Sequence, residues 1–343
     1  MAGSVAIVGA GQIGRAACQV FTTAGWDVTV LARTSPAWPL GSGRFRRHIS
    51  GQDATPDCDV LLDTIAFDDA DIAQYDAKRV QRLIVVSSAS VYCDSAGRTL
   101  DEAAKNGFPQ FGGPITEGQL TVEPGPETYS TRKVRMEQAA RLHFGARATV
   151  LRPCAIHGPW SRHPREWWFV KRIADRRRIV PVAHNGESRF QTTAVSLLAE
   201  ASERAASRGI GGTFNIADDG APTVKEIAHS IADNMSALLD LVGFEGSGVE
   251  DGVGRTPWSI PRPMQISSDR AISALNLSPL PYSVAVASAV NWLAENPPAD
   301  WRAAYPQLAA YPWDLFDYAA EDRFLAGIGG ARTSARAPSE SLP

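Results

Sequence analysis

The strongest constraint on the fold lies near the start of the chain, where three glycines are spaced as Gly9-x-Gly11-x-x-Gly14. An apolar run over 4–8 precedes them, and a helical pattern over 14–24 follows. In such a strand–turn–helix unit, the first glycine allows a tight turn, the second lets backbone approach a pyrophosphate, and the third permits close helix packing. The helix N-terminus offers N–H groups and partial positive charge to phosphates. The sequence therefore predicts a dinucleotide-binding turn with candidate contacts Gly9, Gly11, Gln12, Ile13 and Gly14.

Short apolar runs alternate with helical patterns along most of the chain. These runs are rich in Val, Ile and Leu, and most lack in–out alternation, which is typical of strands buried on both faces. Helical patterns over 14–24, 130–143 and 195–207 separate several of them. This alternation predicts an α/β fold with a doubly wound parallel sheet. The candidate strands are 4–8, 26–32, 59–64, 82–87, 148–152 and 213–217.

The amino-acid composition of the sequence changes after Arg152. Residues 154–190 are rich in Trp, Arg and His, and residues 241–265 are rich in Gly and Pro and read as loops. Helices near 283–296 complete what looks like a second, smaller lobe. We expect a dinucleotide-binding domain over 1–153 and about 190–218, a C-terminal substrate lobe over about 154–189 and 219–326, and a disordered tail over 327–343.

Composition narrows the class of protein. The net charge of −3, from 34 basic and 37 acidic residues, argues against a broad nucleic-acid surface. No stretch approaches the roughly 18 uninterrupted apolar residues of a membrane span, and the first residues lack the basic segment of a signal peptide. The four cysteines show no metal-binding spacing. We expect a cytoplasmic protein that has no metal site and acts on a small molecule, without nucleic-acid or membrane partners.

The end of the second predicted strand bears on the cofactor. An acidic residue there would accept a hydrogen bond from the ribose 2′-hydroxyl of NAD. This chain has Leu31-Ala32-Arg33-Thr34-Ser35 instead, which places a cation where a 2′-phosphate would lie. The sequence therefore favours NADP, with NAD as the alternative. Arg33 could also stack on adenine or point into water.

Three further residues suggest proton transfer. Ser88 follows the run 82–87, and ligands of open α/β sheets bind beyond the carboxyl ends of strands; a helix cap is the simpler reading of a lone serine. Tyr129 and Lys133 are four residues apart and share a helix face. A neighbouring ammonium lowers the pKa of a phenol, which would make Tyr129 a general acid or base. The alternative is a surface tyrosine beside a solvated lysine.

Taken together, these segments resemble the extended short-chain dehydrogenase/reductases, the NAD-dependent epimerase/dehydratase proteins. The resemblance covers most of the chain and follows the family's order. The similar segments are the glycine turn GAGQIG, the serine segment VVSSASVY, the Tyr-x-x-x-Lys of Tyr129-Ser130-Thr131-Arg132-Lys133, LRPCAIHGP (151–159), the substrate-lobe segment GESRFQ (186–191) and TFNIADDGAPTVKEIA (213–228).

The resemblance implies roles for individual residues. Tyr129 would be the acid/base, Lys133 would lower its pKa and bind the nicotinamide ribose, and Ser88 would polarise the substrate oxygen. Ala66 joins the cofactor contacts. Candidate substrate contacts are Ser88, Ser90, His157 and Arg189, and Arg189 could instead pair with an acidic neighbour such as Glu187. A homodimer is a further implication.

Departures from the family pattern limit the choice of reaction. Val8 stands where the branch usually has its first turn glycine. Ala89 and Ser90 replace the Asp-Glu pair of dehydratases, which argues against dehydration, and Ala155 stands where nucleotide-sugar enzymes often have Asn. We expect an NADP(H)-preferring oxidoreductase acting on a ketone or secondary alcohol. A sugar epimerase with retained NAD and a non-catalytic NADP-sensing protein are the alternatives.

Overall fold

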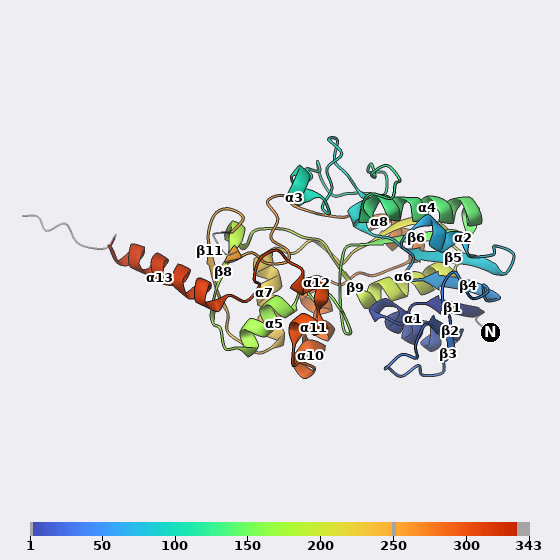
Figure 1. Cartoon of the computed structure of the whole chain (residues 1–343), viewed down its shortest axis with the longest axis horizontal. Helices are drawn as coiled ribbons and strands as arrows, with labels where there is room; N and C mark the ends of the chain where they lie inside the picture. The colour runs from blue at the N-terminus through green and yellow to red at the C-terminus, as the bar shows by residue number, and fades with distance from the viewer. Residues whose placement is uncertain (1–2, 249–251, 335–343) are drawn as a thin grey trace, which may run out of the picture.

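A seven-stranded parallel sheet forms the centre of the larger part of the molecule (Figure 1). The computed structural model describes residues 3–248 and 252–334. The strand order is β10-β6-β5-β4-β1-β2-β3, which confirms the predicted doubly wound α/β fold. The six predicted strands are all present, and one edge strand, β3, was not predicted. The strands are β1 Ser4–Val8, β2 Asp27–Ala32, β3 Arg44–Arg47, β4 Cys58–Asp63, β5 Val80–Val86, β6 Ala148–Pro153 and β10 Gly212–Ile216.

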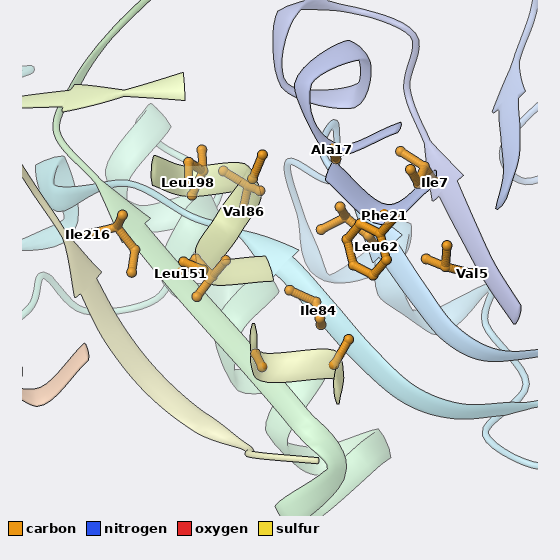
Figure 2. Close-up of a cluster of buried hydrophobic side chains, with 14 of the residues drawn as sticks. Val5, Ile7, Ala17, Phe21, Leu62, Ile84, Val86, Leu151, Leu198 and Ile216 are labelled. Atoms are coloured by element: carbon orange, nitrogen blue, oxygen red, sulfur yellow. The ribbon is translucent and has the colours of Figure 1, made fainter. Parts of the chain in front are cut away.

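Helices cover both faces of this sheet, which explains why the strands lack alternation. Successive residues of β1 enter opposite cores. Ile7 belongs to a cluster to which helices α1 (Gln12–Thr23) and α6 (Val195–Ser207) contribute, and Figure 2 shows it near Ala17 and Phe21 of α1. Its neighbour Val8 packs on the other face, in the core that α2 (Asp69–Ala73) and α4 (Tyr129–Phe144) help to form. Both side chains of such a pair must be apolar, so no polar alternation appears.

A second hydrophobic core lies outside the sheet. Figure 1 shows α5, α7 and α10 in the middle of the molecule, between the parallel sheet and α13. Their apolar faces share one cluster, beside the strand pair β8 and β11. The remaining elements, with these, are η1 Ala89–Val91, α3 Ala103–Asn106, η2 Gly145–Arg147, β7 Ala155–His157, α5 Trp167–Ala174, β8 Ile179–Val182, η3 Ala183–Gly186, β9 Thr192–Ala194, α7 Val224–Asn234, β11 Asp240–Gly243, α8 Asp269–Leu275, α9 Tyr282–Ala285, α10 Ala287–Glu295, α11 Trp301–Ala304, α12 Pro306–Ala309 and α13 Tyr318–Ser334.

Helix α13 extends into the range 327–343, for which the sequence predicts a disordered tail. The helix continues to Ser334, and the rest of the predicted tail, 335–343, lies outside the described residues. Its first turns are anchored by charge: Glu321 pairs with the buried Arg172, and Asp322 accepts a hydrogen bond from Arg177 at 2.6 Å. None of the described helices has the length and apolar character needed to span a bilayer.

Candidate nucleotide and substrate site

The glycine turn has the geometry that its sequence predicts. Gly9 has φ +107°, and a Cβ there would overlap the hydroxyl of Thr64. A Cβ on Gly14, in the first turn of α1, would overlap the carbonyl oxygen of Gly9. By contrast, a Cβ on Gly11 would meet open space. Two of the three glycines are therefore required by the protein's own packing, whereas Gly11 leaves room for an approaching ligand.

A cavity of about 990 Å³ opens in front of this turn. Gly9, Gly11, Gln12 and Arg33 line it, and the C-terminal lobe closes it with aromatic side chains that include Trp160. The Gln12 side chain also donates a hydrogen bond to the Gly158 carbonyl at 3.0 Å, which joins the start of α1 to the lobe. The other predicted cofactor contacts, Ile13, Gly14, Ala66, Tyr129 and Lys133, lie outside the lining of this cavity.

The charge of this cavity is positive. Arg33 and Arg162 contribute cations to its lining, burial lowers the pKa of the lining residue His48, and none of the described lining residues is acidic. The carboxylate that would bind a ribose 2′-hydroxyl at the end of β2 is thus absent in the structure as in the sequence. The size, the room at Gly11 and the charge fit a dinucleotide at this site.

Ser88, Tyr129 and Lys133 come together beyond the carboxyl end of β5. Ser88 accepts a hydrogen bond from the Ser90 N–H at 3.1 Å and so caps η1. Tyr129 opens helix α4, and Lys133 follows one turn later. The Lys133 ammonium donates to the carbonyls of Ala66 and Val86 at 2.6 and 2.9 Å and lies 5.7 Å from the Tyr129 ring centroid. The predicted shared face of Tyr129 and Lys133 is therefore present.

Burial shifts the pKa of both Lys133 and Tyr129. Burial lowers the pKa of Lys133 from 10.5 to about 8, with the charge of Asp63 acting against that shift. Although Tyr129 is 42% exposed, desolvation raises its pKa, and a hydrogen bond with Ser88 opposes the rise. Lowering of the Tyr129 pKa by Lys133 stays a prediction; in the structure the Lys133 ammonium donates to two backbone carbonyls.

A second cavity, of about 510 Å³, adjoins Ser88. Ser88 and Ser90 line it on the side of the sheet, and Arg165 and Arg255 line it on the side of the C-terminal lobe. We call it the substrate cavity. Across the described residues, no group of three or more His, Cys, Asp and Glu side chains is arranged to hold a metal ion.

His157 does not reach the substrate cavity, which corrects its prediction as a substrate contact. It ends β7 and is 1% exposed. Its Nε2 lies 2.7 Å from an Asp218 carboxylate oxygen. Burial would lower the pKa of His157, but the hydrogen bond and charge of Asp218 outweigh burial and raise it. Asp218 also accepts from the Thr192 hydroxyl at 2.8 Å, so His157 belongs to a buried network that joins β7 to β9.

Arg189 is also placed differently from the prediction. It lines a separate cavity of about 550 Å³, donates to the Ala221 carbonyl at 3.0 Å and lies 3.6 Å from Glu226. Glu187, the neighbour considered as its partner, pairs with Lys225 at 2.6 Å instead. Arg189 is therefore not a lining residue of the substrate cavity, because the loop directs it towards the start of α7.

Sequence reasoning missed a buried network behind the site. The Glu137 carboxylate, on α4, accepts hydrogen bonds from Arg152 Nε at 2.8 Å and from the Ser87 hydroxyl at 2.6 Å. Glu137 is fully buried, and Arg152 is 4% exposed. The network ties the helix that carries Tyr129 to the ends of β5 and β6. Its signal in the sequence was a charged residue, Arg152, at the end of an otherwise apolar strand.

The fold matches that of solved sugar epimerases. UDP-glucuronic acid 4-epimerase from Bacillus cereus, in complex with UDP-glucuronic acid and NAD, is 14% identical with a TM-score of 0.62, covering 85% of this chain and 99% of that chain. UDP-N-acetylglucosamine 4-epimerase from Bacillus cereus is 16% identical with a TM-score of 0.62, covering 86% and 100%. Neither a scan against protein-family models nor a search of curated proteins found a match. At these identities the likeness establishes the fold, and it confirms the resemblance at that level.

Proposed function

We propose that this chain is a nicotinamide-dependent enzyme of the extended short-chain dehydrogenase/reductase family. It would interconvert a ketone and a secondary alcohol. The observation that carries the proposal is the convergence of Ser88, Tyr129 and Lys133 beyond the carboxyl end of β5, where Ser88 lines the substrate cavity. In the division we propose, residues 1–153 and about 190–218 hold the cofactor, and the remaining lobe completes the substrate cavity.

Each residue has a role that follows from its surroundings. A bound nicotinamide would supply or accept the hydride. The raised pKa of Tyr129 keeps its phenol protonated, which is the state that donates a proton to a carbonyl oxygen. Ser88 would donate a hydrogen bond to that oxygen. Lys133, held by two backbone carbonyls, would bind the nicotinamide ribose.

We propose NADP(H) as the preferred cofactor. Arg33 supports this preference because it lies at the rim of a cavity whose described lining has no carboxylate. A guanidinium binds a phosphate more strongly than a hydroxyl. We expect Arg33→Gln to weaken NADPH binding about tenfold, the value of one charge-assisted contact, and to leave NADH binding unchanged.

A sugar epimerase with retained NAD is the second candidate. The compared structures favour it, since they are 4-epimerases and one was solved with NAD and a UDP-sugar. The same three residues would then remove and return hydride at one carbon. A non-catalytic NADP-sensing protein is a third reading, and an intact Ser88–Tyr129–Lys133 set argues against it.

The test is to purify the protein, denature it and identify any released nicotinamide nucleotide by chromatography. The emptied protein is then titrated calorimetrically with NADPH and NADH. An empty protein that prefers NADPH supports the exchangeable-cofactor enzyme. Stoichiometric retained NAD supports the epimerase and refutes the argument from Arg33. In either enzyme, Tyr129→Phe should abolish turnover while nucleotide binding survives; unchanged turnover would rule out the catalytic role.

A further inference from the structure

Two arginines of the substrate cavity form no ion pair with the described residues, although Arg165 interacts electrostatically with the buried Glu166, whose carboxyl pKa is raised by burial. Within the described parts of the chain, neither Arg165 nor Arg255 forms an ion pair with a carboxylate. The Nε of Arg165 is buried and has no hydrogen-bond acceptor. Arg255 stacks on Trp313, with its guanidinium carbon 4.4 Å from the ring centroid. A partly buried cation without a counter-ion is unfavourable unless a ligand supplies the negative charge.

The acidic residue that shares this cavity with the two arginines is engaged elsewhere. Asp101 is the sole carboxylate among the described lining residues. One of its oxygens accepts from the Ser130 N–H at 3.1 Å, and the other accepts from the Thr99 hydroxyl at 2.6 Å. Asp101 therefore stabilises the N-terminus of α4 and forms an ion pair with neither arginine of the cavity.

Most of the remaining wall is apolar. Phe108, Phe190, Met264 and Trp313 are among its lining residues. The hydroxyls of Thr256 and Ser259, also in the lining, are 3.0 Å apart and bond to each other.

This wall offers few hydrogen-bond partners to hydroxyl groups of a ligand. Ser90 bonds to the Ser130 hydroxyl at 3.1 Å, so it too is engaged. A hexose needs a partner for each buried hydroxyl, and an unpaired hydroxyl is costly. The cavity suits a ligand with an apolar body better than a sugar.

We propose that the substrate is a ketone or secondary alcohol with an apolar, aromatic body and one anionic group, which Arg165 and Arg255 bind together. The reacting oxygen faces Ser88, and the anion, a carboxylate or a phosphate, lies at the lobe side. The assignment of a ketone or secondary alcohol rests on the proposed function. The assignment of an anion-binding site to the two arginines does not rest on it. This substrate class differs from the UDP-sugars of the compared structures.

Calorimetric titration of the cofactor-free protein tests the anion site without turnover. The probes are benzoylpropionate and benzoylbutyrate, two aromatic keto acids of different length, with their methyl esters. At least one acid should bind, and its ester should bind about tenfold or more weakly, because the ester loses the charge-assisted hydrogen bonds. Phenyl phosphate is the matched phosphate probe; tighter binding than the acids would identify phosphate as the anion.

Variants connect binding to the two arginines. Arg165→Gln and Arg255→Gln should each weaken binding of the acid about tenfold and leave binding of the ester unchanged. Arg178→Gln, at an exposed arginine outside the substrate cavity, is the matched control and should bind like wild type. Tyr129→Phe should also bind the acid normally, so loss of the proposed catalysis leaves the anion site measurable.

Several results would overturn the proposal. They are equal binding of acid and ester, acid binding unaffected by both arginine substitutions, and failure of every anionic probe to bind. UDP-glucose is the remaining probe. If it binds more tightly than the aromatic acids and loses affinity in Arg165→Gln, the cavity accepts a nucleotide-sugar and the apolar substrate class is wrong. The acid–ester comparison uses wild-type protein, so it decides the question even if a variant is unstable.

Discussion

Substitution of Glu137 by Gln is the sharpest test of the buried network. Glu137 is 0% exposed and neutralises Arg152, which is itself 4% exposed. Removing one partner of a buried pair typically costs 3–5 kcal/mol, roughly, because the other charge is left uncompensated. Gln keeps an acceptor for one of the hydrogen bonds, so we expect a loss of about 3 kcal/mol, at the lower end.

Urea unfolding followed by circular dichroism measures this loss. Arg141→Gln is the matched control, since Arg141 pairs with the same Glu137 carboxylate at 2.7 Å but is 45% exposed. An exposed pair contributes less than about 1 kcal/mol, so this variant should remain close to wild type. The two substitutions therefore separate the buried charge from the surface charge on a single carboxylate.

The pH dependence gives a second readout. Burial would raise the pKa of Glu137, but the hydrogen bond and charge of Arg152 outweigh it and hold the pKa below its usual value of 4.5. The stabilisation is present above pH 4.5 and is lost as the pH falls through the lower folded value. Glu137→Gln should lack this acid-induced loss. A Glu137→Gln protein within about 1 kcal/mol of wild type, or one equal to Arg141→Gln, would refute the reasoning.

Three further predictions follow from the same geometry. Gly14→Ala should lower both the urea midpoint and the nucleotide affinity, because its Cβ overlaps the Gly9 carbonyl oxygen. Gly11→Ala should lower only the nucleotide affinity, and equal urea midpoints for the two variants would contradict this. Burial lowers the pKa of Lys133 from 10.5 to about 8 in the folded protein. The buried ammonium therefore lowers the free energy of unfolding below about pH 8, and this loss is recovered as the pH rises from about 8 towards 10.5. Lys133→Met should lack that recovery in urea unfolding, and identical slopes would contradict the buried ammonium. Leu142, 83% exposed on α4, is a candidate dimer contact, and Leu142→Glu should shift a dimer to monomer in ultracentrifugation; an unchanged dimer would exclude this contact.

The sequence was most informative where local chemistry decides structure. The strand β1 and its glycine turn were predicted because apolar runs and a required positive φ at Gly9 are properties of a few adjacent residues. The edge strand β3 was missed because its sequence, RFRR, is largely exposed and has no apolar pattern. His157 and Arg189 were misplaced for a different reason. Their partners, Asp218 and Glu226, are 61 and 37 residues away, and only the fold decides those pairings.

The aromatic rim of the nucleotide cavity has an optical consequence. Trp160 and Trp292 both line it, with ring centroids 5.8 Å apart, and Trp38 donates its indole N–H to the Ala10 carbonyl of the glycine turn. Reduced nicotinamide absorbs light in the range where indole emits. A reduced cofactor in this cavity would therefore quench tryptophan fluorescence by energy transfer, whereas an oxidised one would not do so by that route. Tryptophan fluorescence would therefore report the binding of reduced cofactor in this cavity without an added label.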